Sequence, residues 1–334
     1  MRNKINKIFS ILFIGHFSKD SIIKNNIQYE PTIGGSISFG SLSLKTYARK
    51  INVRIVSNCG NKNFSPSLLD LLRKKEIDLK GIKWFNTENT SFILEYFSNS
   101  RTLTLKSKSP NLNFLDIPES YLHNPPDAII IAPLCNEVSG DYIETILKQF
   151  PDALIGIDLQ GFIRKFNEKG EVFYASDKDL INYIYKIIDL VGERLILKGS
   201  EIEMKLLAGN GDDLNKIMSK FDNSKLKGLF IMTLGEAGSM LIKSRKKILK
   251  IPAFKPKVVK DETGAGDVYL AIFIYEYLNS DKTWPSVKKC ALLASSAASF
   301  LVEEIGPSGI KKKKKVLYRL NKKNYIKRGN LNSY

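Results

Sequence analysis

The sequence predicts an α/β protein built as three layers, with a doubly wound, mostly parallel sheet between helices on both faces. Short runs rich in Ile, Leu and Val alternate with segments of helical period over most of the 334 residues. Most of these runs are continuously apolar, which is typical of strands buried on both faces. The length and the 43% hydrophobic content suit one large domain with a smaller appendage.

Each element follows from its own stretch of sequence. Runs with the composition of strands lie at 8–14, 51–56, 128–132, 153–157, 194–198, 229–233 and 239–242. Segments of helical period lie at 40–49, 66–75, 139–149, 201–208, 212–220 and 268–278. In the first of these, Gly40, Leu44, Tyr47 and Ala48 fall on one face. This alternation is that of βαβ units, which place their strands in parallel.

One region, residues 81–105, breaks the alternation. Its sequence has no helical stretch, and "SFILEYF" and "RTLTL" flank the turn-forming "SNS" as two strands of a hairpin would. Together with residues 21–33 it predicts a small β-sheet that acts as a lid over a site. An extra antiparallel edge on the main sheet is the alternative. We therefore expect a main domain at 1–310 that contains this lid, followed by a basic tail at 311–334.

Charge is concentrated in that tail. The formal net charge is +18, and residues 311–328 hold ten Lys or Arg and no acid. Blocks of like charge are typically solvated, and no interleaved aromatic platform accompanies this one, so we expect no nucleic-acid partner. The remaining positive charge of the body favours capture of a small anionic molecule.

The chain has no feature that predicts a membrane or a disulfide framework. The apolar run at 8–14 is too short for a membrane span and lacks a cleavage site, so it is expected to be a buried strand. Cys59, Cys135 and Cys290 match no zinc or redox spacing, which indicates a reduced, cytoplasmic compartment.

The stretch "DETGAGD", residues 261–267, combines a glycine-rich turn with carboxylates just before the helical run. Small residues at a helix N-terminus let backbone N–H groups approach a phosphate, but a carboxylate such as Asp267 repels one. The two belong together in a phosphotransferase, where N–H groups stabilise the transferring phosphoryl and the carboxylate accepts a proton from the attacking hydroxyl. A plain helix cap, with Asp261 or Thr263 as N-cap, is the structural alternative.

These residues resemble the ribokinase-like (pfkB-type) carbohydrate kinases, including archaeal members, over about residues 8–310. In that family a GAGD motif forms the anion hole and supplies the catalytic aspartate, which corresponds here to Gly264, Ala265, Gly266 and Asp267. The resemblance implies a ribokinase-like fold and an ATP-dependent, Mg²⁺-requiring kinase that phosphorylates a hydroxyl of a sugar, cyclitol or nucleoside. A catalytically weak ligand-binding or regulatory protein on the same fold is the alternative.

Further site residues follow from the resemblance. Substrate binding is implied for Asp20, Gly34, Gly35, Phe39 and Arg164, nucleotide binding for Ser200, Thr233, Gly235, Gly238 and Thr263, and metal binding for Glu203 (Mg²⁺) and Asp261 (a monovalent cation). Phe39 replaces an asparagine of many relatives, which suggests an acceptor with an apolar face or a helix-core role. Ser200 and Glu203 also read as a capping box, and Glu262 replaces Thr or Ser. A homodimer through the lid is compatible with its exposed sheet edges.

Overall fold

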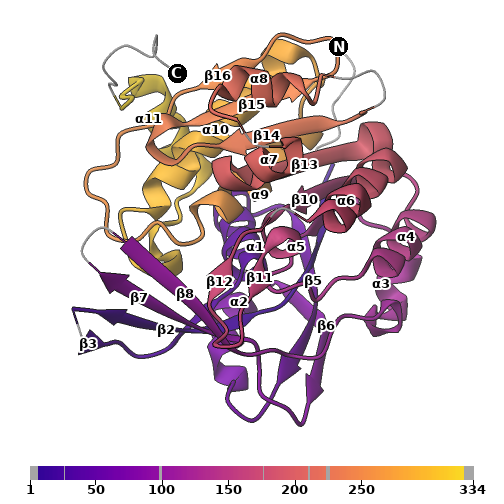
Figure 1. Ribbon diagram of the computed structural model, residues 1–334, viewed down its shortest axis with the longest axis vertical. Coiled ribbons are helices and arrows are strands. Elements are labelled where there is room, and N and C mark those ends of the chain that lie inside the picture. The colour runs from indigo at the N-terminus through magenta and orange to yellow at the C-terminus, as the bar shows by residue number, and fades with distance from the viewer. Residues whose placement is uncertain are drawn as a thin grey trace.

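The computed structural model describes residues 7–25, 27–97, 100–175, 177–209, 211–222 and 226–326. A large central sheet lies between two helical layers, and a smaller sheet projects from one side of it (Figure 1). Within these residues no helix combines the length and hydropathy that crossing a bilayer would require.

The central sheet has nine strands within the described residues, in the order β16-β15-β14-β13-β10-β9-β1-β5-β6. The strands from β6 to β14 pair in parallel, and β15 and β16 add an antiparallel edge. Their bounds are β1 Ser10–Ile14, β5 Asn52–Gly60, β6 Asp78–Phe85, β9 Ala128–Ile131, β10 Leu154–Asp158, β13 Leu195–Ser200, β14 Leu229–Thr233, β15 Ser239–Lys243 and β16 Leu249–Ile251. The strand order reverses direction beside β1, which is where ligands bind in doubly wound sheets.

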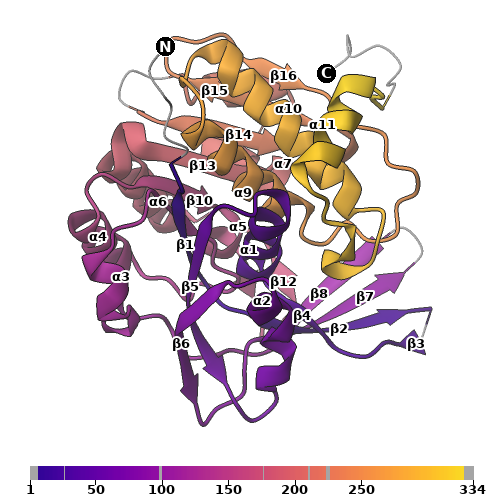
Figure 2. The ribbon, with the colours of Figure 1, turned by 180° about the vertical axis from the view of Figure 1, so that it is seen from behind.

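Successive side chains of the strands point to opposite faces, so each face of the sheet has its own core. In β1, Ile11 and Phe13 belong to one core and Leu12 and Ile14 to the other. The first face is covered by α1 Ser36–Tyr47, α2 Asp70–Lys74, α9 Ala265–Leu278, α10 Trp284–Leu301 and α11 Lys313–Lys322 (Figure 2). The second is covered by α3 Glu119–His123, α4 Gly140–Gln149, α5 Gln160–Ile163, α6 Lys178–Val191, α7 Glu201–Ala208 and α8 Leu214–Ser219. The predicted three-layer α/β class is confirmed.

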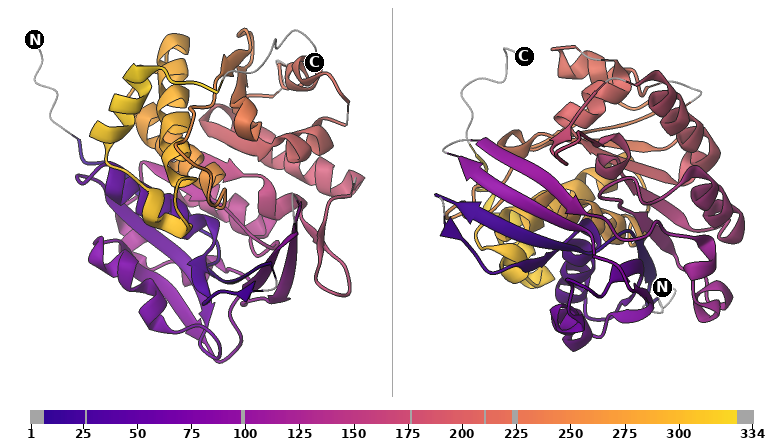
Figure 3. Two further views of the ribbon diagram at one scale, coloured as in Figure 1. Left: turned by 90° about the vertical axis from the view of Figure 1, so that its left-hand side faces the viewer. Right: turned by 60° about the horizontal axis from the view of Figure 1, so that its bottom comes forward.

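The smaller sheet comes from two separate segments of the chain. It has the order β3-β2-β7-β8, with β4 also paired to β2. Its strands are β2 Ser18–Lys24, β3 Ile27–Gln28, β4 Thr32–Gly34, β7 Ser91–Phe97 and β8 Ser100–Ser107 (Figure 3). It is therefore a separate sheet and not an added edge of the main one. The tip of the expected hairpin turn, residues 98 and 99, lies outside the described residues.

The expected range of 81–105 for the lid was too wide. Residues 78–85 form β6, which pairs in parallel with β5 at the edge of the main sheet. The half-polar composition of this stretch hid its role, because an edge strand needs fewer buried side chains than a central one. Asp20 lies within β2.

The small sheet is held to the main domain by a short hairpin, β11 Lys165–Phe166 and β12 Val172–Phe173. The Leu105 N–H donates to the Gly170 carbonyl at 2.8 Å, and Thr104 bridges to Glu171. Gly170 has φ 80°, and a Cβ there would lie 2.1 Å from the Leu105 carbonyl oxygen, so only glycine fits this contact.

The expectation of a solvated basic tail was wrong for residues 313–322, which form α11 on the surface of α10. Val316 is fully buried, and the Ser296 hydroxyl donates to its carbonyl at 3.0 Å. Arg319 is buried too, where it donates to Glu303 at 2.6 Å and to the Ser299 hydroxyl at 3.0 Å. The apolar residues at helical spacing inside the basic run carry this packing, and the lysines between them obscured the pattern.

Candidate active site

The site is organised around the N-terminus of α9, where Gly264 ends the preceding loop with φ 81°. A Cβ at Gly264 would lie 2.3 Å from Cδ1 of Phe39, so α1 and α9 approach too closely for any other residue. The Val268 N–H donates to the Gly264 carbonyl at 2.9 Å and starts the helix, while the Ala265 N–H donates to the Glu262 carbonyl at 3.2 Å. The first-turn N–H groups of such a helix have no acceptor within the helix and can serve an anion.

Asp267 lies in this first turn and its carboxyl group has a shifted pKa. Burial, and to a lesser extent the neighbouring Asp158 carboxylate, raises this pKa to about 6. Lys198 and a hydrogen bond with Ser36 act in the opposite direction without cancelling the rise. A carboxyl group with this pKa is ionised at neutral pH and is a better proton acceptor than an ordinary aspartate.

A buried ion pair that sequence reasoning missed lies behind this turn. Lys198 on β13 donates to Asp158 at the end of β10 at 2.6 Å, and the side chains are 6% and 1% exposed. Burial alone would lower the pKa of Lys198, but the carboxylates around it, with Asp158 first, outweigh burial and raise it. A Cβ at Gly266 would lie 2.8 Å from the Lys198 Nζ, so the ammonium group is close to the backbone of the glycine-rich turn.

A cavity of about 580 Å³ opens on one side of the turn, between α9 and the small sheet. Asp20 lies in its wall, with its carboxylate directly over Gly34: a Cβ at Gly34 would lie 1.8 Å from Oδ2. Gly35, with φ 93°, is the N-cap of α1 and also lines the cavity. The remaining polar side chains of its wall are those of Ser18, Ser36, Gln160, Arg164, Lys198, Lys260, Asp261, Glu262, Thr263 and Asp267, and the apolar ones are those of Phe39, Phe92, Leu94, Tyr96, Leu103, Leu134 and Val259.

Phe39 belongs to the core of its face of the sheet and also contributes to the wall of this first cavity. It is 3% exposed. Arg164 is buried at the end of α5 and lines the same cavity, and its carbonyl accepts from Asn136 at 2.9 Å. Among the described residues, the Arg164 Nε and the Thr263 hydroxyl are buried without a hydrogen-bond partner.

A second cavity, of about 810 Å³, opens on the other side of the same turn. Thr233, Gly235 and Gly238, for which nucleotide binding is expected, line it from the β14–β15 connection. The two cavities share Val259, Glu262 and Gly266, so they meet at the N-terminus of α9. Glu262, whose identity departs from the family pattern, is thus on the boundary between them.

The predicted metal residues are engaged in structural hydrogen bonds. Ser200 and Glu203 form a capping box at the start of α7, in which the Ser200 N–H donates to Glu203 at 2.7 Å. Neither residue is among those that line the two cavities described above. Asp261 accepts from the Thr263 N–H at 2.9 Å and, through its other oxygen, from the Gly306 N–H at 3.4 Å.

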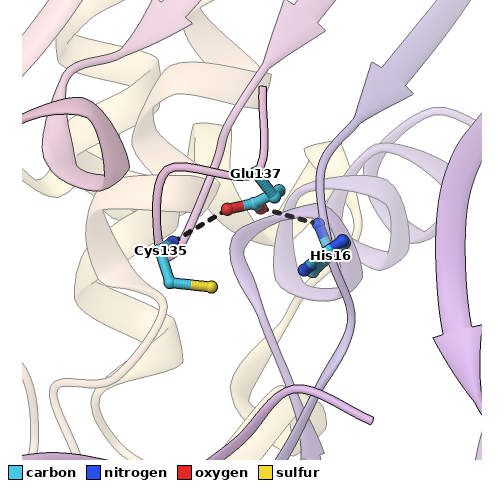
Figure 4. A group of neighbouring side chains, drawn as sticks. All are labelled: His16, Cys135 and Glu137. Atoms are coloured by element: carbon cyan, nitrogen blue, oxygen red, sulfur yellow. Dashed lines mark hydrogen bonds between the residues drawn. The ribbon is translucent and has the colours of Figure 1, made fainter. Parts of the chain in front are cut away.

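Among the described residues, the one group of His, Cys, Asp and Glu side chains close enough to share a metal ion lies elsewhere (Figure 4). It comprises His16, Cys135 and Glu137, and all three are buried. The Glu137 carboxylate accepts from the backbone N–H groups of His16 at 3.0 Å and Cys135 at 2.8 Å. The His16 ring nitrogens contact the Pro110 carbonyl at 3.0 Å and the Thr90 hydroxyl at 2.9 Å. The group thus joins the loop after β1 to the base of the small sheet by hydrogen bonds.

Residues 163–314 match the pfkB family of carbohydrate kinases. Over this range, a little under half of its length, the chain is similar to the pfkB-type kinases. The matched range includes α5 to α10 with the GAGD turn, and it ends at the start of α11.

Curated relatives align with this chain over part of their length. The nucleoside kinase of Methanothermobacter thermautotrophicus is 36% identical over 107 residues, 30% of this chain and 32% of that protein. The nucleoside kinase of Methanocaldococcus jannaschii is 41% identical over 76 residues, 23% and 24% of the two chains. The chain therefore aligns with about a third or less of the length of these relatives.

Solved structures share the ribokinase-like fold over nearly the whole chain. The Methanocaldococcus jannaschii nucleoside kinase has a TM-score of 0.69 at 19% identity and covers 95% of this chain. A pyrophosphate-dependent kinase of the ribokinase family, in complex with a pyrophosphate analog and myo-inositol, has a TM-score of 0.71 at 19% identity and 92% coverage. Both alignments span 99% of the other chain, so the fold extends beyond the matched family region.

Proposed function

We propose that this protein is an ATP-dependent kinase that phosphorylates a hydroxyl group of a small molecule, with Asp267 as the general base. The observation that carries the proposal is the position of Asp267 in the first turn of α9, where the two cavities meet. An acceptor in the cavity beneath the small sheet and a phosphate donor in the other would face each other across this turn.

The chain's own residues fit a phosphate donor at this turn. Gly266 lines both cavities without a side chain that would hold a phosphate away from the backbone, and the buried Thr263 hydroxyl has no partner among the described residues. Lys198 adds a positive charge beside Gly266. Bound ATP would supply the γ-phosphoryl group, and Mg²⁺ would neutralise charge on its oxygens. We propose that Glu203 reaches that ion through water, since Mg²⁺ retains much of its hydration shell and Glu203 lies behind the cavity wall.

The proposed step is a direct transfer. As the acceptor oxygen forms its bond to phosphorus, its proton passes to the Asp267 carboxylate, and the bond to the leaving diphosphate oxygen breaks. The turn's N–H groups and Lys198 stabilise negative charge on the transferring group. Asp20, Gly34 and Gly35 orient the acceptor hydroxyls, and the small sheet with residues 18–34 and 91–107 excludes water.

Among acceptors, we favour a nucleoside over a sugar or a cyclitol. The first cavity has a polar side near Asp20 and an apolar side of five side chains from the small sheet and its surroundings, together with Phe39. A nucleoside has a matching hydroxyl-rich part and a flat, less polar base. The two archaeal relatives described above are nucleoside kinases, which supports the same choice.

The test is a turnover screen with ATP against nucleosides, pentoses, hexoses and cyclitols, with pyrophosphate as a second donor. We expect nucleosides to give the highest kcat/KM, and Asp267→Asn to lower turnover about 10²-fold to 10⁴-fold. Near-normal turnover in this variant would remove Asp267 as the base. Acceptor binding without turnover of any acceptor would favour the alternative, a regulatory ligand-binding protein.

Activation by a monovalent cation at Asp261 remains part of the proposal. Asp261 lies in the wall of the first cavity and holds the loop before the glycine-rich turn, so a cation there would stiffen the turn. Equal rates in K⁺, Na⁺ and a bulky organic cation would contradict this part alone.

A further inference from the structure

The outer wall of the second cavity is formed by residues that follow the last helix. Asn324, Tyr325 and Ile326, here named the C-terminal strap, all line this cavity. They lie 10 or more residues beyond the end of the family match at residue 314. The wall they provide is therefore a feature of this chain outside the matched pfkB region.

Specific contacts hold the strap in place. Lys323 ends α11 in the left-handed region with φ 51°, which turns the chain back toward the segment after β16. The Lys255 N–H donates to the Asn324 carbonyl at 2.9 Å, and the Ile326 N–H donates to the Ala253 carbonyl at 3.0 Å. Between them, the rings of Tyr325 and Phe254 pack with their centroids 4.8 Å apart. The strap is thus paired like a short strand along residues 253–255.

The cavity offers two chemically distinct surfaces to one ligand. Ala265 and Gly266 bring the N-terminus of α9, where a phosphate is attracted. The strap side brings aromatic and aliphatic groups, with Phe254, Tyr325 and Ile326 lining the same space. Two backbone groups of the strap, the Asn324 carbonyl and the Ile326 N–H, pair with residues 255 and 253, and this pairing holds the strap against the cavity that it lines. A ligand that fills both surfaces carries phosphate at one end and a flat apolar group at the other.

We propose that the C-terminal strap binds the base of the nucleotide donor and that Tyr325 is a specificity-determining residue for nucleotides over inorganic phosphate donors. This rests on the proposed kinase function and deepens it, since it assigns the donor's base to a wall outside the matched family region. Tyr325 is only part-exposed, because one side packs on Phe254 while the remaining ring surface lines the cavity. Stacking on an aromatic side chain stabilises a bound base, because every base has a flat π-face.

The experiment measures equilibrium binding of ADP and of inorganic tripolyphosphate to the full-length protein by calorimetry. We expect Tyr325→Ala to weaken ADP binding about tenfold, equivalent to about 1.4 kcal/mol, and to leave tripolyphosphate binding within twofold, because tripolyphosphate has no base. Tyr325→Phe keeps the ring and should bind ADP like the unmodified protein. Removal of residues 324–334 should reproduce the Tyr325→Ala result. Tyr318→Ala is the matched control, since Tyr318 is 63% exposed on α11 and lines neither cavity.

Several outcomes would overturn the inference. These are an unchanged ADP affinity in Tyr325→Ala, an equal loss for ADP and tripolyphosphate, or tripolyphosphate binding with no ADP binding in the unmodified protein. Thermal melting of each variant checks that the fold is retained. The two proposals fail separately: ADP binding that depends on Tyr325 without turnover of any acceptor would contradict the kinase proposal and leave the strap in place. Turnover of an acceptor together with an ADP affinity that does not depend on Tyr325 would contradict the strap proposal and leave the kinase proposal in place.

Discussion

Asp267 is held in a state that favours proton transfer and opposes stability. Its pKa is raised to about 6 by burial and by Asp158, so the folded protein binds this proton more tightly than the unfolded chain does. The stability associated with the bound proton is present at low pH and is lost as the pH rises through about 6. Ionised Asp267 therefore lowers the free energy of unfolding at neutral pH, where catalysis requires the ionised form.

We predict two linked pH dependences for this residue. The kcat/KM of the unmodified protein should rise between pH 5 and pH 7 with an apparent pKa of about 6, because the base must be deprotonated. Asp267→Asn should be more stable than the unmodified protein at pH 8, by roughly 1–3 kcal/mol, and this difference should vanish toward pH 4. Urea denaturation at the two pH values measures it. A stability difference that is the same at both would contradict the raised pKa.

The buried Lys198–Asp158 ion pair is expected to contribute both to stability and to turnover. Lys198→Met should lower the free energy of unfolding by about 3–5 kcal/mol, because it leaves the Asp158 carboxylate buried beside Asp267 without its cation. It should also lower turnover about 10²-fold by removing positive charge from the anion site.

The double variant Lys198→Met with Asp158→Asn separates the two effects. It should recover part of the lost stability, since the Asp158 carboxylate is no longer buried without its cation, but it should not recover turnover. Recovery of turnover together with stability would mean that Lys198 serves only the fold.

At the scale of elements, α11 determines whether the basic C-terminal run is structural. Arg319→Ala should lower the free energy of unfolding by about 3–5 kcal/mol, because it leaves Glu303 buried and unpaired. Lys315→Ala, on the exposed side of the same helix, should change it by less than about 0.5 kcal/mol. Urea denaturation measures both, and equal effects would show that α11 contributes only charge.

Helices and strands could be predicted from the sequence only where the local pattern of apolar residues is clear. The strands at 128–131, 154–158 and 229–233 were found because fully buried strands are continuously apolar. The edge strand β6 and the helix α11 were not, since their polar residues outnumber the apolar ones that pack.

Some residues of the candidate site could likewise be predicted from the local sequence, and others could not. The GAGD turn and the glycine pair at 34–35 were predicted from contiguous letters, and the structure brings Gly35 to the same cavity as Gly264, Gly266 and Asp267. The Lys198–Asp158 pair joins residues 40 positions apart in sequence. It exists because β10 and β13 are neighbours in the sheet, with Asp158 in register with Lys198. No local pattern contains that strand order, and the same holds for the pairing of the strap with residues 253–255.

At the scale of the whole molecule, the small sheet has one face over the first cavity and an edge at β3 with no strand beyond it among the described residues. Ile27 on this edge is 60% exposed, and Tyr29 beside it is 46% exposed. An exposed apolar sheet edge is a surface on which a second copy can pair, because unpaired backbone groups and apolar side chains are both satisfied there.

We predict that the protein is a homodimer joined through this edge of the lid. Sedimentation velocity should show a dimer for the unmodified protein and a monomer for Ile27→Lys, since a buried lysine opposite its symmetry mate would be repelled. Leu190→Lys is the control, because Leu190 is also exposed, at 46%, but lies on α6 of the main domain and not on the small sheet. If the lid is also steadied by pairing, the monomeric variant should show a higher acceptor KM with an unchanged ADP affinity. A monomeric unmodified protein, or a dimer that survives Ile27→Lys, would contradict the prediction.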